Sequence, residues 1–155
     1  MLTVSDGVAA GTREDLSGEC LADLLASAGY EVERRVVPDE RDTIAAALRD
    51  LAGRVQVVLT TGGTGLAPRD VTPEATLDVV DRVAPGIAEA VRADAIARTP
   101  HGLLSRGVAG LVGSTLVVNL PGSRGGCRDG FEVLRRALPH ALELLAGRPG
   151  AHEQT

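Results

Sequence analysis

The stretch from Val55 to Thr76, VQVVLTTGGTGLAPRDVTPEAT, constrains the fold more than any other part of the sequence. It opens with an apolar, largely β-branched run, Val55 to Leu59, which is typical of a strand buried on both faces. It ends with Thr72-Pro73-Glu74, which predicts a helix start with Thr72 as N-cap and Pro73 in the first helical position. A buried strand followed closely by a helix favours an α/β fold with a mostly parallel sheet.

The loop between this strand and helix is rich in glycine and reads TTGGTG over residues 60–65. Glycine permits positive φ angles and lets backbone N–H groups approach a ligand, and a concave run of such amides binds anions. The chain contains no lysine, so this is not a Walker loop, and the GxGxxG spacing of dinucleotide sites is absent. We interpret the loop as a phosphate site of another kind; the alternative is an ordinary strand-to-helix turn.

Arg69 and Asp70 follow after three intervening residues, and we call residues 60–70 together the glycine loop. A carboxylate beside a phosphate site is repulsive unless a cation lies between them, so Asp70 suggests Mg²⁺. The alternative is that Asp70 pairs with Arg69 or caps a turn. From the residues alone, the loop supports a phosphate and a metal and no particular reaction.

The sequence TTGGTGLAPRDVTPEAT resembles the signature of the molybdenum-cofactor biosynthesis family that includes Mog, MoaB and the G domains of gephyrin-type proteins. The resemblance continues over nearly the whole chain. Family members with the full motif are similar to molybdopterin adenylyltransferases, which join AMP from Mg-ATP to the terminal phosphate of molybdopterin and release pyrophosphate. The resemblance therefore implies the three-layer α/β sandwich of molybdopterin-binding domains, Mg²⁺, ATP and molybdopterin as substrates, a homotrimer, and transient contact with other molybdenum-cofactor enzymes.

Composition limits the class of protein. The chain has 155 residues, of which 44% are hydrophobic, and we expect one molybdopterin- and nucleotide-binding domain over residues 1–147 followed by a short polar tail, residues 148–155. Aromatic residues make up 1% and the net charge is −5, which argues against a nucleic-acid partner. The sequence shows no apolar run long enough for a membrane and no signal peptide, and its two cysteines lack metal spacing, so we expect a cytoplasmic protein.

The remaining elements follow from hydrophobic spacing. We expect a short strand ending at Val4, then a helix capped by Ser17 and stopped by Gly29. Further expected elements are a strand at 31–37, helices starting at Asp42 or Thr43, at Pro73 (running past Val83) and at Ile87, strands at 107–112 and 114–119, and a final helix through Phe131 to Leu145, bent at Pro139.

Four polar segments follow predicted strands at their carboxyl ends, where parallel sheets bind ligands. They are residues 5–7, 38–40, 61–65 and 121–123. By resemblance, Asp39 and Asp70 are the catalytic acids and would hold Mg²⁺. The predicted substrate- and nucleotide-binding residues are Ser5, Asp6, Thr61, Gly62, Gly63, Thr64, Gly65, Pro121, Gly122 and Ser123.

Each of these residue types has a structural alternative. Asp39 precedes a predicted helix, and its sequence context alone favours a helix-start acid. Asp6 lies in a common turn sequence, and Ser123 can cap the helix that follows it. Two other functions also remain open. One is a non-catalytic molybdopterin-binding protein of the same family. The other is a hydrolase of nucleotide pyrophosphates, similar to competence-damage-type relatives, which usually carry an extra domain.

Overall fold

The computed structural model describes residues 1–147, so the predicted tail at 148–155 lies outside the described residues. The described chain forms a six-stranded sheet in the order β2-β1-β3-β6-β5-β4. Strands β2, β1, β3 and β6 run parallel, while β5 and β4 are antiparallel to their neighbours. The predicted mostly parallel α/β sheet is confirmed. The strands are β1 (Leu2–Val4), β2 (Arg35–Val37), β3 (Val57–Thr61), β4 (Arg82–Val83), β5 (Ala109–Val112) and β6 (Thr115–Leu120).

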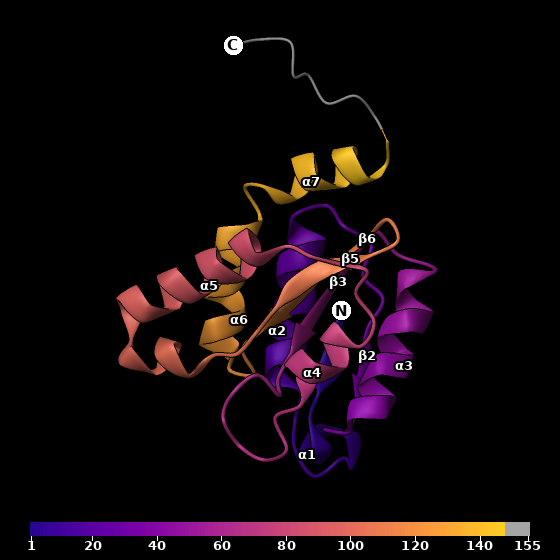
Figure 1. Cartoon of the computed structure of the whole chain (residues 1–155). Helices are drawn as coiled ribbons and strands as arrows, with labels where there is room; N and C mark the ends of the chain where they lie inside the picture. Colours follow the sequence, from indigo (N-terminus) through magenta and orange to yellow (C-terminus); the bar gives the residue numbers. More distant parts are fainter. Residues whose placement is uncertain (148–155) are drawn as a thin grey trace.

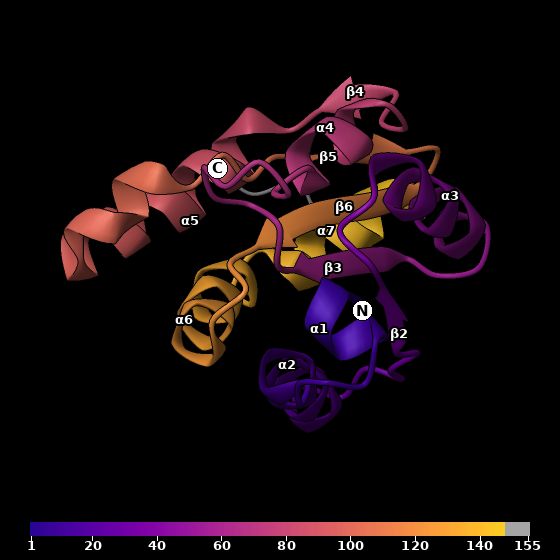
Figure 2. The ribbon, with the colours of Figure 1, turned by 90° about the horizontal axis from the view of Figure 1, so that it is seen from below.

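Helices cover both faces of this sheet, which gives three layers (Figures 1 and 2). Helices α2, α5, α6 and α7 contribute to the hydrophobic cluster on one face, and α3 and α4 to the cluster on the other. The helices are α1 (Asp6–Ala9), α2 (Leu16–Ser27), α3 (Arg41–Ala52), α4 (Thr72–Leu77), α5 (Pro85–Arg98), the 3₁₀ helix η1 (Pro100–Leu104), α6 (Arg124–Leu134) and α7 (Leu138–Leu145).

The central strands β3 and β6 explain why their sequences are continuously apolar. Successive side chains of a strand point to opposite faces, and both faces are covered here. Leu59 packs in the cluster to which α2, α5, α6 and α7 contribute, while its neighbour Val58 packs in the cluster of α3 and α4. On β6, Val118 and Val117 divide in the same way, and the register pairs Leu59 with Val118 and Val58 with Val117.

The strand order reverses at β1, which pairs with β2 on one side and β3 on the other. At this edge the carboxyl ends of β1, β2, β3 and β6 lie together. The backbone N–H of Ser5 donates to the carbonyl of Val37 (3.0 Å), and that of Gly62 donates to Leu120 (3.3 Å). The four predicted polar segments therefore share one rim of the sheet, which we call the carboxyl rim.

Several predicted boundaries were wrong, and pairing decides two of them. The strand predicted at 31–37 forms only over Arg35–Val37, because β1 offers partners from Leu2 to Val4 alone. The helix predicted to run past Val83 ends at Leu77, because the chain then returns as β4 to pair with β5. Tertiary hydrogen bonding here overrides local helical spacing.

Helix termini account for the other corrections. Asp15, rather than Ser17, caps α2 and accepts from Gly18 N (2.9 Å). Helix α3 begins at Arg41, before the predicted Asp42 or Thr43. The final helix is two helices, and Pro139 lies in the first turn of α7 rather than at a bend. Proline suits that turn because its missing N–H would have no partner within the helix.

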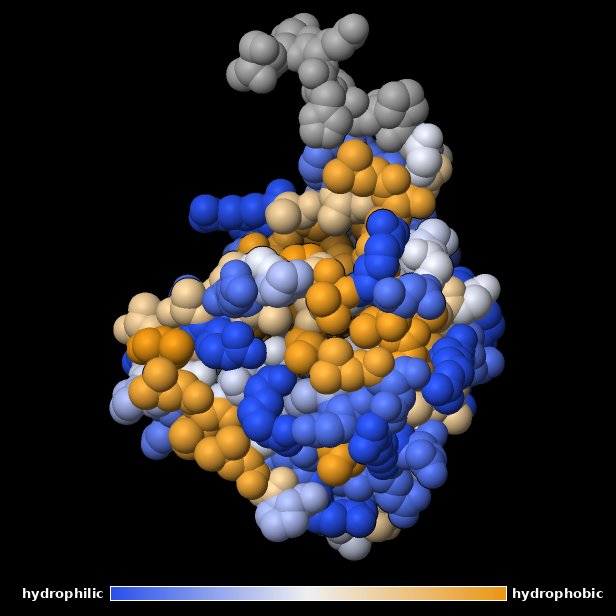
Figure 3. Space-filling model, in the orientation of Figure 1, coloured by the Kyte–Doolittle hydropathy of each residue, from blue (hydrophilic) through white to orange (hydrophobic). Residues whose placement is uncertain are grey.

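Some large apolar side chains remain on the surface. Leu66, Val83 and Leu103 are each more than half exposed, and Figure 3 shows hydrophobic residues gathered in patches on one face. Among residues 1–147, the helices are all too short or too polar to cross a membrane.

Candidate functional site

The glycine loop at the end of β3 adopts a conformation that requires glycine. Gly62 has φ +103° and Gly63 has φ +65°, in the region that side chains disfavour. A side chain at Gly62 would also collide with the carbonyl of Val4. Thr72 fixes the other end of the loop, since its hydroxyl donates to the Gly62 carbonyl (2.9 Å) and its N–H donates to Gly63 (3.1 Å).

That contact corrects the prediction for Thr72. Helix α4 begins at Thr72 itself and its N-cap is Val71, without a side-chain cap. The hydroxyl of Thr72 is a donor to the loop and makes no hydrogen bond of the N-cap kind. Pro73 does lie in the first turn, as predicted.

A second turn, residues 121–123, packs directly against the glycine loop. A side chain at Gly122 would lie 3.1 Å from the Cα of Gly62. Thr61 joins the two segments, because its hydroxyl donates to the carbonyl of Pro121 (2.9 Å). Ser123 caps α6 by accepting from Gly126 N (3.1 Å), so the structural alternative for Ser123 is correct. The N-terminus of α6, with its free amides and positive dipole, thus begins beside the glycine loop.

Cys127 supports both turns from beneath. It is fully buried, and its Sγ lies 3.0 Å from Thr61 Oγ1 and 3.0 Å from the Pro121 carbonyl. Burial raises the pKa of the Cys127 thiol to about 11. The thiol is therefore neutral at physiological pH and acts as a buried packing group.

Asp6 and Asp39 face one another across the ends of β1 and β2. The N–H of Asp6 donates to Asp39 Oδ2 (2.8 Å), and the N–H of Asp39 donates to Asp6 Oδ1 (3.0 Å). Ser5 caps α1 by accepting from Val8 N (3.3 Å). Arg69 from the glycine loop reaches over this pair and donates two hydrogen bonds to the Asp6 carboxylate, at 3.0 and 2.8 Å.

The two acids differ electrostatically. The hydrogen bonds from Arg69 and from the Asp39 backbone hold the pKa of Asp6 below its usual value. The pKa of Asp39 is raised, first because it is partly buried and further because the negative charges of Asp6 and Asp70 lie close by. The charges of Asp6 and Asp70 therefore both act on Asp39, and Arg69 counters mainly the Asp6 charge.

Asp70 closes the glycine loop. Its Oδ2 accepts a hydrogen bond from Ala67 N (2.9 Å), and its own N–H donates to the Ala67 carbonyl (2.9 Å). The predicted alternative of a pair with Arg69 is wrong, because Arg69 turns to Asp6, but the turn-capping alternative is observed. Capping uses one carboxylate oxygen, which leaves the other available to a ligand.

Two cavities open on the carboxyl rim. The first, which we call the Asp39 cavity, has a volume of about 570 Å³ and includes Arg13 and Arg124 in its lining. The second, the α5 cavity, has a volume of about 520 Å³ and extends between α5, η1 and α6. The two cavities share Gly63, Asp70, Gly122 and Ser123. Two ligands bound in them would therefore meet at Asp70 and at the amides of both turns.

The predicted site residues converge on these cavities with one exception. Asp6 lines neither, because its carboxylate is bound to Arg69. The structure brings the others together in the linings of the two cavities: Ser5, Asp39, Thr61, Gly62, Gly63, Thr64, Gly65, Asp70, Pro121, Gly122 and Ser123.

The rim also fits a magnesium ion held jointly with substrate. Within residues 1–147, no three His, Cys, Asp or Glu side chains gather into a group that could hold a metal alone. Mg²⁺ in phosphate-transfer sites is usually bound by one or two carboxylates together with substrate phosphates and water. Asp39 and Asp70 are two such carboxylates. Burial and the negative charges of Asp6 and Asp70 raise the pKa of Asp39, and a bound cation would stabilise its ionised form.

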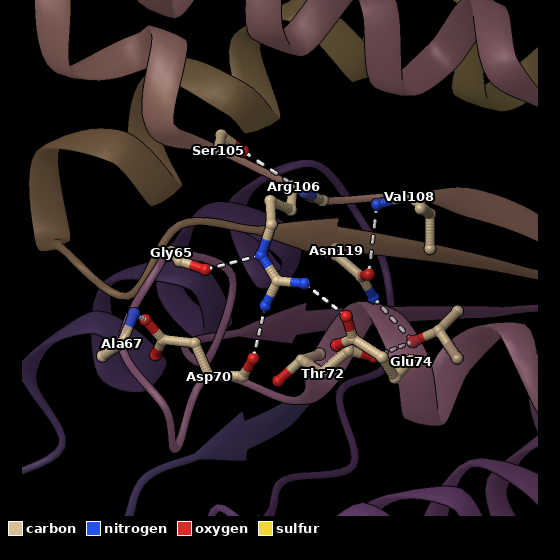
Figure 4. A network of polar contacts seen from close by, with 11 residues as sticks. Gly65, Ala67, Asp70, Thr72, Glu74, Ser105, Arg106, Val108 and Asn119 are labelled. Atoms are coloured by element: carbon tan, nitrogen blue, oxygen red, sulfur yellow. Dashed lines mark hydrogen bonds and ion pairs between the residues drawn. The ribbon is translucent and has the colours of Figure 1, made fainter.

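Sequence reasoning missed two groups of residues at this site. His101, which carries no motif in the sequence, lines the α5 cavity. Arg106, which precedes β5, and Asn119, in β6, bond to the glycine loop, to the end of β3 and to α4 (Figure 4). The Asn119 side chain accepts from Val108 N and donates to Thr60 and Thr76. Single residues in unremarkable contexts carry no local signal of such long-range contacts.

Comparisons with known proteins agree with this geometry. The family described as "Probable molybdopterin binding domain" matches residues 1–140. The chain is similar to the molybdopterin adenylyltransferase of Helicobacter pylori strain J99, with 37% identity over 152 residues that cover 95% of this chain and 86% of that protein. It is 40% identical over 149 residues to the molybdenum cofactor synthesis protein cinnamon of Drosophila melanogaster, covering 94% of this chain and 25% of that much longer protein.

A solved structure shows the same fold. The crystal structure of the molybdopterin biosynthesis enzyme MoaB from Thermus thermophilus superimposes with a TM-score of 0.88 at 48% sequence identity. The match covers 96% of this chain and 95% of that one. The likeness therefore extends over the sheet, both helical layers and the carboxyl rim.

Proposed function

This chain belongs to the molybdopterin-binding-domain family of molybdenum-cofactor biosynthesis, and we propose that it is a molybdopterin adenylyltransferase. The reaction transfers AMP from ATP to the terminal phosphate of molybdopterin and releases pyrophosphate. The observation that carries the proposal is the pair of cavities that meet at Gly63, Asp70, Gly122 and Ser123. A transfer between two phosphate-bearing substrates needs two adjoining sites with anion-binding groups at their junction.

The chemistry asks mainly for positioning. The molybdopterin phosphate is already ionised at neutral pH, so it can attack the α-phosphorus of ATP without a strong general base. The P–O bond to the β-phosphate breaks as the new P–O bond forms, and the electron pair leaves with pyrophosphate. Holding the attacking and leaving oxygens in line supplies most of the acceleration in such a reaction.

The amides of the two turns would bind the phosphates. Residues 63–65 of the loop and the first turn of α6 line the α5 cavity, so their backbone N–H groups are the proposed phosphate donors. Ser123 accepts from Gly126 N through its lone pair, which leaves its O–H free to donate to a phosphate oxygen. Arg13 and Arg124 add positive charge in the Asp39 cavity.

Asp39 and Asp70 are the proposed catalytic acids and the proposed magnesium ligands. They lie in the loops that follow two different strands, β2 and β3, yet line the same cavity. When bound, Mg²⁺ would neutralise charge on the ATP phosphates and on the leaving pyrophosphate. The backbone N–H of Asp6 donates to the Asp39 carboxylate and that of Ala67 to the Asp70 carboxylate, which holds both carboxylates in place before substrate arrives.

The test is a reconstituted reaction. Purified protein is mixed with molybdopterin and Mg-ATP, and pyrophosphate and adenylylated molybdopterin are measured together. Both products should appear in equal amounts. Tight molybdopterin binding without pyrophosphate release would instead indicate the binding-protein alternative. Release of AMP without adenylylated pterin would indicate the hydrolase.

A further inference from the structure

Arg106 lies between η1 and β5, far in sequence from the glycine loop, yet most of its polar atoms bond to that loop or to the helix after it (Figure 4). Its Nε donates to the Gly65 carbonyl (2.8 Å) and its Nη2 to the Asp70 carbonyl. Its Nη1 forms an ion pair with Glu74 in α4, and its backbone N–H donates to the Thr64 carbonyl (2.9 Å).

The guanidinium is well suited to this contact. It is planar and presents its N–H groups in a fixed fork, whereas a lysine ammonium is a point donor on a flexible stem. The fork bonds to residues 65, 70 and 74 at once. The separation of the Gly65 and Asp70 carbonyls is thereby fixed, and with it the shape of the loop between them.

Asp70 is held from two sides in this arrangement. Arg106 binds its backbone carbonyl, and Ala67 N binds one oxygen of its carboxylate. Together these contacts determine where the Asp70 carboxylate lies at the junction of the two cavities. Arg106 itself lines neither cavity, so its effect on a ligand must pass through the loop.

Glu74 provides the charge that keeps Arg106 in place. Burial acts to raise its pKa, but the hydrogen bond from Arg106 and the nearby positive charges bring the pKa below its usual value. Its second carboxylate oxygen, Oε2, is buried and has no hydrogen-bond partner among the described residues. The Glu74 side chain as a whole is 37% exposed, so solvent screens the ion pair, and the hydrogen bonds of the fork to the Gly65 and Asp70 carbonyls carry the positioning argument.

The loop contributes little to the hydrophobic core. Residues 66–69 are exposed, and Leu66 is 65% exposed. Loosening the loop should therefore affect the stability of the fold less than the geometry of the site. This difference separates a positioning role from a purely structural one.

We propose that Arg106 is a positioning residue of this site: its guanidinium holds the glycine loop and Asp70 in the arrangement that adenylyl transfer requires. This inference rests on the proposed function for its kinetic consequence, but not for its structural one. A displacement of about 1 Å at a reacting centre can lower the rate roughly 10²-fold.

The experiment compares Arg106→Lys, which keeps the charge but loses the fork, with Arg54→Lys as a matched control. Arg54 also combines an ion pair with a hydrogen bond to a backbone carbonyl, both to Asp50. It precedes β3 and so lies at the amino end of that strand, away from the carboxyl rim. Arg106→Lys should lower kcat for pyrophosphate release about 10²-fold and change the Kd for molybdopterin only a few-fold. Arg54→Lys should leave both constants unchanged.

A double variant tests the route of the effect. If Arg106 acts by placing Asp70, Arg106→Lys should lower kcat little further in an Asp70→Asn protein. Losses that multiply would show that Arg106 acts independently of Asp70 and would overturn the inference. So would a kcat for folded Arg106→Lys within twofold of wild type.

Hydrogen exchange gives a readout that does not depend on the reaction. Amides of residues 63–70 should exchange faster in Arg106→Lys, while those of β3 and β6 stay protected. If Arg106→Lys does not fold, Glu74→Gln takes its place, because it keeps the acceptor for Arg106 but removes the negative charge. The same amides should exchange faster in Glu74→Gln than in wild type. Unchanged loop exchange overturns the inference even if the wild-type protein proves to be an adenylyltransferase. Faster exchange with an inactive wild type contradicts the proposed function alone.

Discussion

Replacing Asp70 with asparagine separates the chemical role of this acid from its structural one. The Oδ2 atom of Asp70 accepts a hydrogen bond from Ala67 N at 2.9 Å. Asparagine retains a side-chain carbonyl oxygen of the same reach, so the turn keeps its hydrogen bond. What Asp70→Asn removes is the negative charge at the cavity junction.

Asp70→Asn should affect the stability of the fold much less than it affects kcat. Because the hydrogen bond survives, the unfolding free energy of Asp70→Asn should fall by less than about 1 kcal/mol. Loss of a preorganised electrostatic contact that matters mainly in the transition state typically lowers kcat by about 10²- to 10³-fold. The Kd for molybdopterin should change little, since the loop amides remain.

The assay measures pyrophosphate release at saturating ATP and molybdopterin, together with urea unfolding of the same samples. Asp70→Ala is the companion variant, because it removes both the charge and the acceptor for Ala67 N. It should be as slow as Asp70→Asn and about 1 kcal/mol less stable than it. Pyrophosphate release by Asp70→Asn at the wild-type rate would refute the catalytic assignment and favour the binding-protein alternative.

Four further predictions address other parts of the structure. Gly62→Ala should cost about 3 kcal/mol or more in unfolding free energy, because φ is +103° and the new methyl group meets the Val4 carbonyl. Gly113→Ala, at φ +58° in open space, should cost only ~1 kcal/mol. Equal losses of stability in the two variants would contradict this prediction. The pKa of the Cys127 thiol is raised from 9.0 to about 11 in the folded protein, so the thiol of the unfolded chain ionises at a lower pH. The unfolding free energy of the wild type should therefore be unchanged below pH 9 and fall by ~2 kcal/mol by pH 10.5. Chemical unfolding of Cys127→Ala should not show this decline. ATP affinity measured by calorimetry should drop strongly in EDTA, and equal affinity with and without Mg²⁺ would count against Asp39 and Asp70 as its ligands. The exposed apolar patches (Figure 3) should be partly covered in a homotrimer, and light scattering that shows a monomer at micromolar concentration would disprove this.

Much of the sheet could be predicted because its central strands are buried on both faces. Val57–Thr61 and Thr115–Leu120 lie close to where their apolar runs place them. The sequence could not show where β2 begins or α4 ends, since both depend on a partner strand. Arg35 begins β2 opposite Leu2, the first residue of β1, and the chain after Leu77 leaves the helix to reach β5.

The location of the site could be predicted for a similar reason. The polar segments after four strands must lie at one rim once those strands run parallel. The hydrogen bonds among them could not be predicted. Nothing in the local sequence indicates that Arg69 pairs with Asp6 rather than Asp70, or that Arg106 spans the glycine loop. These pairs depend on loop geometry and join residues 36 to 63 positions apart.

The side chains of the long motif divide into two groups with different consequences. The hydroxyls of Thr61 and Thr72 donate to backbone carbonyls, and the glycines allow the loops to pack backbone on backbone. A protein that only binds molybdopterin needs all of these residues, because they build the rim. Asp39 and Asp70 stand apart, since they concentrate negative charge in a cavity where an anionic substrate would bind. Such a charge disfavours simple anion binding and becomes useful only when a cation or a transition state is stabilised there. Retention of both acids therefore favours the transferase over a binding protein, which is why the Asp70→Asn assay decides between them.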